Sequence, residues 1–224
     1  MAISAFPEGR RSMVAAAHRL LELGLHSISK HGNLSVRAPE GDAMLLSSVS
    51  SLDSISDDTQ ALVGLDGAVR EGKLDPIAAE IVKMHAVVYR LRSDVGGVIH
   101  THSPHATAFA VAGKPIGRFY EGLVRWDVTD PVPVAEYGPR GSRRAVDNIA
   151  RAIDSAPGCK AVLLANHGVL VFDRDLATAI RVHAGLEEAA QLALLASGIG
   201  QPRELSADDV KAAIARRDEF ASTH

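Results

Sequence analysis

The sequence of 224 residues has a single cysteine, Cys159, few aromatic residues and no long hydrophobic run. A lone cysteine cannot form an internal disulfide, so nothing in the chain calls for an oxidising compartment. Aromatic residues make up only 4% of the chain, so the core must consist mainly of alanine, valine, leucine and isoleucine. The longest apolar runs, such as residues 161–165, fall far short of the roughly 20 residues that a membrane-spanning helix needs.

A targeting segment and a cluster of basic residues are also missing. The first 13 residues, MAISAFPEGRRSM, contain no apolar stretch of the length found in signal peptides. The formal net charge is -3 and lysine and arginine do not cluster, which argues against nucleic acid as a primary partner. The 46% of hydrophobic and 23% of charged residues are typical of a globular chain. We therefore expect a cytoplasmic protein that binds neither nucleic acid nor membrane.

The apolar pattern predicts helices that alternate with short strands. Apolar residues recur with a period near 3.6 in six segments, at 9–25, 76–91, 103–113, 141–154, 175–197 and 206–218. Strands are expected at 33–37, 43–47, 61–67, 96–102 and 131–137, and in both halves of 160–172. Many strand pairs are joined by turns too short for a crossover, which favours a largely antiparallel sheet sandwiched by helices. No repeat or flexible linker divides the chain, so we expect a single domain over residues 1–224.

Two features of these helices can be checked against coordinates. Ser103 and Ser142 each precede a predicted helix and are candidates for its N-cap. The segment 76–91 is predicted to bury one apolar stripe, formed by Ile77, Ile81, Met84, Val88 and Leu91.

Three of the ten histidines fall at the ends of predicted strands. His100 and His102 end the apolar strand at 96–102, and alternate residues of a strand point to the same face. His167 ends another apolar strand, and Gly168 after it permits a tight turn and leaves room for a bound group. Three neutral imidazoles with an open position are the ligand set of catalytic zinc and related metals. The alternative is that these are core histidines satisfied by backbone carbonyls, and the strand-end placement favours the metal.

Glu80 supports the metal interpretation, since it borders the apolar stripe of its helix. Burying a carboxylate carries a large desolvation cost, so it needs a partner, which a metal ion or a substrate proton would supply. The alternative is a surface ion pair with Lys73 or Lys83. Three further histidines lack such support and are interpreted as ordinary histidines or as contacts behind the ligands: His85, His105 and His183.

Four segments of the chain resemble the class II aldolase/adducin family. They are KHGNLSVR (30–37), AAEIVKMHAVVYRLRSDVGGVIHTHSPHATA (78–108), PVPVAEYGPRGS (131–142) and LLANHGVLVF (163–172). They occur in the family's order, and the HTH and NHG motifs together are specific to it. The resemblance implies a three-layer α/β/α fold with a central, mostly antiparallel sheet. It also implies a homotetramer with active sites at the subunit interfaces.

The resemblance further implies a role for individual residues. The metal ligands of the family match His100, His102, His167 and Glu80. The acidic ligand also moves the proton, and Tyr120 falls near a catalytic tyrosine that serves the aldehyde side. One spacing departs from the family, because Glu80 precedes His85 by five residues where four are common.

The family's phosphate site is only partly kept. Val49 stands after Ser48 where glycine is expected, and Ala78-Ala79 replace two serines. Each lost charge-assisted hydrogen bond removes roughly 1.5–3 kcal/mol, which leaves open whether the substrate is phosphorylated. The substrate-binding candidates that remain are Gly32, Asn33, Ser47 and Ser48.

We expect from this resemblance a metal-dependent lyase that cleaves a small hydroxy-ketose, phosphorylated or not, by an aldol cleavage. The metal would stabilise the enediolate, Glu80 would move the proton at its carbon, and Tyr120 would serve the aldehyde oxygen. Three nitrogens and one oxygen suit zinc, with manganese, cobalt or iron as alternatives. The expected partners are a small-molecule substrate and further copies of the chain.

Other activities remain open. The runner-up is a metal-dependent decarboxylase of a hydroxylated aromatic or sugar acid. The guanidinium groups of Arg118 and Arg125, near Tyr120, are suited to bind the carboxylate of such a substrate. Those arginines fit equally well as surface or interface residues. Epimerase or dehydratase chemistry ranks third. A non-catalytic adducin-like scaffold ranks last, because it would not need the four candidate ligands.

Overall fold

Eight strands form one sheet within residues 6–222, the part of the chain that the computed structural model describes. The sheet order is β4-β3-β2-β1-β5-β8-β7-β6, and only the pair β6–β7 is parallel. The predicted, mostly antiparallel sheet is therefore confirmed. The strands are β1 (Gly32–Arg37), β2 (Ala43–Ser47), β3 (Gln60–Gly64), β4 (Val69–Glu71), β5 (Gly97–Thr101), β6 (Val134–Ala135), β7 (Ala161–Leu164) and β8 (Gly168–Asp173).

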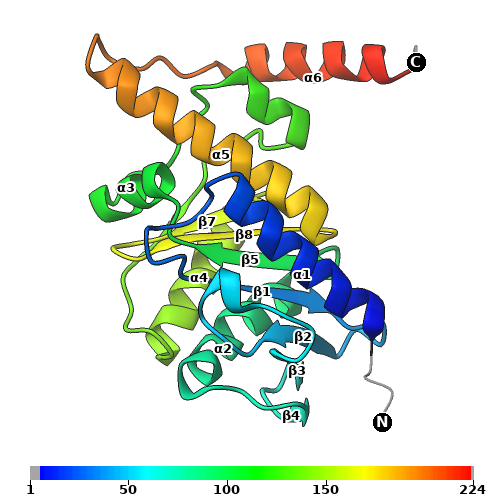
Figure 1. The fold of residues 1–224 in the computed structure, drawn as a ribbon. Helices are drawn as coiled ribbons and strands as arrows, with labels where there is room; N and C mark the ends of the chain where they lie inside the picture. Colours follow the sequence, from blue (N-terminus) through cyan, green and yellow to red (C-terminus); the bar gives the residue numbers. More distant parts are fainter. Residues whose placement is uncertain (1–5, 223–224) are drawn as a thin grey trace.

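Helices cover both faces of this sheet, which completes the predicted three layers (Figure 1). The α-helices are α1 (Pro7–Glu22), α2 (Pro76–Leu91), α3 (Pro104–Ala112), α4 (Arg143–Ser155), α5 (Leu176–Ser197) and α6 (Ala207–Ser222), with short 3-10 helices η1 (Leu52–Ser54) and η2 (Glu121–Trp126). The helices α2 and α4 pack on one face. The helices α1, α3 and α5 pack on the other, and α6 lies against η2. Among the described residues, no helix combines the length and apolar character needed to span a membrane.

The alternation of side chains along each strand decides which layer a residue joins. Val98 on β5 belongs to the core under α2 and α4, whereas Ile99 belongs to the core under α1 and α5. His100 therefore points to the α2 face. The register of β1 against β5 places Asn33 directly opposite His100. Side chains directly opposite one another share a face, so positions 31, 33 and 35 also point toward α2.

The helix at 76–91 is confirmed, but its predicted stripe is wrong at both ends. Ile77 is 44% exposed and Leu91 is 41% exposed, although Ile81, Met84 and Val88 are buried as predicted. The stripe missed the true buried face because small and polar residues also belong to it. These additional buried residues include Ala78, Val82, His85, Ala86 and Tyr89.

The two predicted serine caps differ. Ser142 caps α4 by accepting the backbone N–H of Ala145 at 3.1 Å, as expected. Ser103 occupies the predicted N-cap position of α3, but its side chain makes no capping bond and its hydroxyl instead lies 3.0 Å from Nε2 of His183.

The helix α3 is capped instead by a carboxylate from α5. The backbone N–H groups of His105 and Ala106 donate to Glu187 at 2.8 and 2.9 Å. A carboxylate at a helix N-terminus is stabilised by the unpaired N–H groups and by the helix dipole. Burial raises the pKa of Glu187, but these backbone bonds, together with side-chain hydrogen bonds from Ser103 and His105, leave the pKa below its usual value.

We expect Glu187→Ala to lower the free energy of unfolding by about 2 kcal/mol, because two N–H groups lose their acceptor in a largely buried place. Chemical denaturation followed by circular dichroism measures the loss. Glu188→Ala is the matched control, since Glu188 is exposed and bonds to neither N–H group, and it should change stability by less than about 0.5 kcal/mol. Equal losses in the two variants would show that the cap contributes nothing.

Candidate metal centre

Three histidine rings meet where β5 ends and where the β7–β8 turn returns to the sheet. The ring centroids of His100 and His102 are 5.0 Å apart. The centroid of His167 lies 4.8 Å from that of His100 and 5.0 Å from that of His102. The structure thus brings together the three histidines that the sequence singled out.

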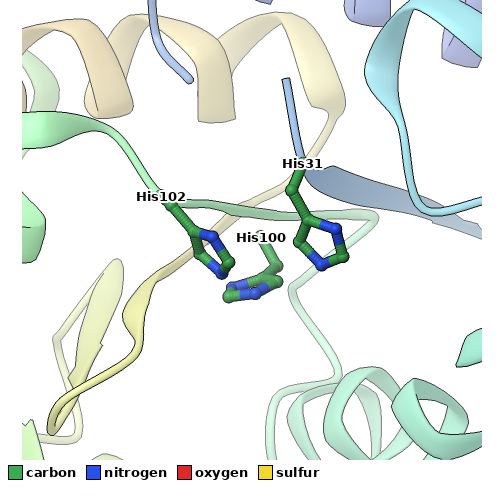
Figure 2. A group of neighbouring side chains, drawn as sticks. All are labelled: His31, His100 and His102. Carbon is green, nitrogen blue, oxygen red and sulfur yellow. The ribbon is translucent and has the colours of Figure 1, made fainter. Parts of the chain in front are cut away.

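A fourth ring, His31, joins this group and was missed in the sequence. It stacks on His102 with a centroid distance of 4.9 Å and an interplanar angle of 23°. One ligand nitrogen from each of His31, His100 and His102 lies within 4.8 Å of the other two (Figure 2). The signal was available, because His31 precedes Asn33 by two residues and so points to the same face.

The hydrogen bonds in the group leave ring nitrogens available for a cation. Nδ1 of His100 lies 3.0 Å from the carbonyl oxygen of Val169. A carbonyl only accepts, so Nδ1 carries the proton and Nε2 keeps its lone pair. Nε2 of His102 is buried and has no hydrogen-bond partner among the described residues. A buried polar atom of this kind needs a partner, and a divalent cation fits the donor set.

Burial keeps these imidazoles in the neutral form that binds metals. It lowers the pKa of His102 to about 4, with smaller contributions from His167 and His31. It also lowers the pKa of His100 well below the usual value. For His31 and His167 the same cause lowers the pKa, and the positive charge of Arg140 adds to it.

The turn before β8 holds His167 close to the other rings through its backbone. Asn166 has a left-handed φ of 58°, which asparagine tolerates better than most residues. A Cβ on Gly168 would lie 2.5 Å from the carbonyl oxygen of Thr101 and 2.6 Å from Cδ2 of His102. Position 168 therefore requires glycine, because any side chain there would collide with the end of β5.

Glu80 lies beside the histidines rather than among them. Its side chain is 48% exposed, and its Oε2 accepts a hydrogen bond from Nε of Arg140 at 2.7 Å. Neither lysine considered from the sequence is the partner. Glu80, Arg140 and His167 line one cavity. The carboxylate therefore shares the cavity with a predicted ligand and is held by a cation that the sequence did not single out.

Tyr120 lies in a different place. It immediately precedes η2 and lines a groove between α1 and α5, together with Arg125, Trp126 and Arg181. No histidine lines this groove within the part of the chain that the structure describes. Within one chain, the structure does not bring Tyr120 to the cavity that holds Glu80 and His167.

The substrate-binding candidates divide into two kinds. Oγ of Ser47 accepts the backbone N–H of Leu34 at 3.1 Å, and Gly32 is packed against the carbonyl of His100, so both hold the sheet together. Ser48 is buried at the end of β2. Asn33 is fully buried, yet its Nδ2 has no hydrogen-bond partner among the described residues. Of the four candidates, Asn33 therefore has a buried hydrogen-bond donor that a substrate could satisfy.

Comparison with known families fits this architecture. Residues 11–194 match the model described as Class II Aldolase and Adducin N-terminal domain. The chain belongs to this family. The family resemblance predicted from the four motifs is thereby confirmed.

Named relatives of this class II aldolase-type chain are lyases. It is 30% identical over 202 residues to 5-methylthioribulose-1-phosphate/5-deoxyribulose-1-phosphate aldolase of Rhodospirillum rubrum, covering 90% of this chain and 87% of that one. A solved L-fuculose 1-phosphate aldolase superposes with a TM-score of 0.85 at 26% identity, covering 99% and 100% of the two chains. YgbL of Klebsiella pneumoniae, described as an aldolase/epimerase/decarboxylase without a settled choice, superposes with a TM-score of 0.77 at 30% identity, covering 92% and 97%. The names support the predicted lyase class.

We expect Gly168→Ala to weaken the binding of zinc at least tenfold, because the new methyl group must displace either the end of β5 or the His102 ring. Competition with a chromogenic chelator measures the affinity. Gly158→Ala is the control, since a Cβ there meets no atom within 4 Å. Unchanged affinity in Gly168→Ala would contradict the tight contact.

The buried histidines also predict how the metal-free protein responds to acid. Burial lowers the pKa of His85 to about 3 and that of His183 to about 4, from 6.5. Below pH 6.5 these two histidines therefore bind protons in the unfolded chain but stay neutral in the folded one. We expect the free energy of unfolding to fall by about 1.4 kcal/mol per pH unit for each such histidine down to about pH 4, and no such loss above pH 7.

Guanidinium unfolding in a chelator at pH 5, 6 and 7 tests this slope. His183→Gln should flatten it by up to one histidine's share, whereas the exposed His18→Gln should leave it unchanged. An equal slope in the parent protein and in His183→Gln would refute the assignment.

Proposed function

We propose that the protein is a metal-dependent aldolase that cleaves a carbon–carbon bond of a small hydroxy-ketose phosphate. The observation that carries this proposal is the convergence of neutral imidazoles from three distant segments beside a cavity lined by Glu80, Glu136 and Arg140. The relatives that are named as aldolases of five- and six-carbon sugar phosphates support the substrate class.

We further propose that His100, His102 and His167 hold the metal, with Glu80 as an oxygen ligand and zinc as the ion. His31 offers a competing fourth nitrogen on the ring stacked against His102. When bound, a divalent cation supplies a Lewis acid that stabilises negative charge developing beside a carbonyl.

The protein's own groups would move the protons. Glu80 shares a cavity with His167 and is held there by Arg140, so we assign to it the proton transfer at the carbon next to the substrate carbonyl. Arg140 holds Oε2 of Glu80 and adds positive charge to the same cavity, where it would also attract an anionic substrate. Asn33 supplies an amide donor that has no partner among the described residues, whereas the alanines that replace the two serines of the phosphate site supply no side-chain donor.

Tyr120 fits this chemistry only as a contribution from a second copy. It lies in a groove apart from the histidine cavity of its own chain. We therefore propose a homotetramer, as the family resemblance implies, in which Tyr120 of one subunit serves the aldehyde oxygen in the site of its neighbour.

A decarboxylase is the second candidate. The solved YgbL structure is named for this activity beside the aldolase one, and Arg140 would bind a substrate carboxylate as readily as a phosphate. Assays with ketose phosphates and with hydroxylated aromatic acids separate the two, since the first reaction releases an aldehyde and the second releases bicarbonate.

We expect Glu80→Gln to lower kcat for ketose-phosphate cleavage by about 10²–10⁴-fold, because a positioned proton donor is lost. Coupled detection of the aldehyde measures the rate. Asp42→Asn is the matched control: Asp42 is also an exposed carboxylate paired with an arginine, Arg70, but at the far edge of the sheet. Retained activity in Glu80→Gln, or an equal loss in both variants, would remove Glu80 from the mechanism.

A further inference from the structure

A line of buried hydrogen bonds runs from α2 to Asn33 on β1. The hydroxyl of Tyr89 lies 2.9 Å from Oγ of Ser35, and the same Oγ lies 2.7 Å from Nδ1 of His85. Nε2 of His85 then lies 2.6 Å from Oδ1 of Asn33. All four side chains are at most 2% exposed. The line alternates between the strand and the helix, two residues apart on β1 and one turn apart on α2.

The direction of donation along this line follows from its Asn33 end. Oδ1 of Asn33 is an amide oxygen and only accepts, so Nε2 of His85 carries the proton that joins the two side chains. Ser35 uses its one proton on Nδ1 of that neutral ring, so Oγ of Ser35 accepts the hydroxyl proton of Tyr89.

The remaining bonds take the same sense. Ser35 donates to Nδ1 of His85, which requires the neutral ring with its proton on Nε2. Burial supports this neutral state, since it lowers the pKa of His85 to about 3. Nε2–H then donates to Oδ1 of Asn33, and the amide cannot rotate without losing that bond.

The far end of Asn33 is the part left free. Its Nδ2 is buried and lacks a hydrogen-bond partner among the described residues. The register of β1 against β5 places Asn33 opposite His100, on the face of the sheet that carries the histidine rings. An amide NH2 group only donates, so its partner is a hydrogen-bond acceptor, such as a substrate oxygen, and not a metal ion.

We propose that Tyr89, Ser35 and His85 are positioning residues that fix the Asn33 amide so that its NH2 group donates to an oxygen of the substrate's anionic end. The identity of that substrate rests on the proposed function, whereas the orientation of the amide does not. A purely structural network would stabilise the fold without affecting how tightly an anion binds.

The tautomer of His85 tests the direction in the metal-loaded, full-length protein. Nitrogen-15 spectra of the histidine-labelled protein report which ring nitrogen carries the proton, and His85→Gln identifies the signal. We expect the Nε2–H tautomer from pH 5.5 to pH 8. A proton on Nδ1 would reverse the line and overturn the proposal.

A matched pair of variants tests the effect on binding, with inorganic phosphate as the probe. His85→Leu removes the donor to Asn33, and we expect the Kd for phosphate, measured by calorimetry, to rise about tenfold. His85→Gln keeps an N–H donor at similar reach, and its Kd should stay within about threefold of the parent value. Tyr89→Phe removes only the first donor of the line and should raise the Kd by roughly threefold.

Each result decides the matter. Equal Kd values for His85→Leu and His85→Gln, or no saturable phosphate binding by the parent protein, would overturn the proposal. If ketose phosphates are cleaved, His85→Leu should raise KM about tenfold and change kcat less than threefold, and the reverse split would contradict the assigned role. If the parent protein releases no aldehyde, the proposed function fails, while the tautomer and the phosphate measurements still judge this inference.

Discussion

Four imidazole rings can occupy one small volume only while they carry no charge. Removal from water achieves this, because it lowers the pKa of each ring, and the neighbouring rings lower it further. The cost is a set of lone pairs that water can no longer satisfy, most plainly Nε2 of His102. A group of this kind is stable when a cation takes those lone pairs. The chemistry of these rings and the family membership therefore both support a divalent cation at this place.

The strands of the sheet place these rings close together on one face. Alternation along β1 and β5 places His31, Asn33 and His100 on one face, and the β1–β5 register sets their mutual positions. The hairpin from β7 to β8 then brings His167 to the same place, with Gly168 allowing the contact. The helix α2 covers this face and supplies both Glu80 at the cavity and the buried pair His85 and Tyr89 behind it.

What could be predicted from sequence was mostly local. The period of the apolar residues gave the bounds of α2 without error, and the i, i+2 spacing of His100 and His102 predicted a shared direction. His167 was joined to that pair because it also ends an apolar strand, and the match of motifs supported the grouping, although no local rule places a distant turn beside a strand end. His31 was missed because it precedes the predicted strand and was not counted with it, although its two-residue spacing from Asn33 predicts a shared face.

Contacts made across the fold were the part that could not be predicted. Ser103 has every local feature of a cap, yet Glu187, more than eighty positions along the chain, takes the N–H groups of α3. The exposure of Ile77 and the pairing of Glu80 with Arg140 depend likewise on how α2 meets the segment before α4. These contacts join residues far apart in the sequence, so local sequence patterns do not predict them.

The cap that α5 provides also ties two helices of one layer to the end of β5. The helix α3 starts two residues after His102, so the carboxylate that anchors its first turn also fixes where that ring's backbone leaves the sheet. The long helix α5, on the opposite face of the sheet from α2, thereby helps to place the His102 ring although it contributes none of the four rings. Substitutions along the buried side of α5 would therefore move an imidazole that α5 does not itself carry.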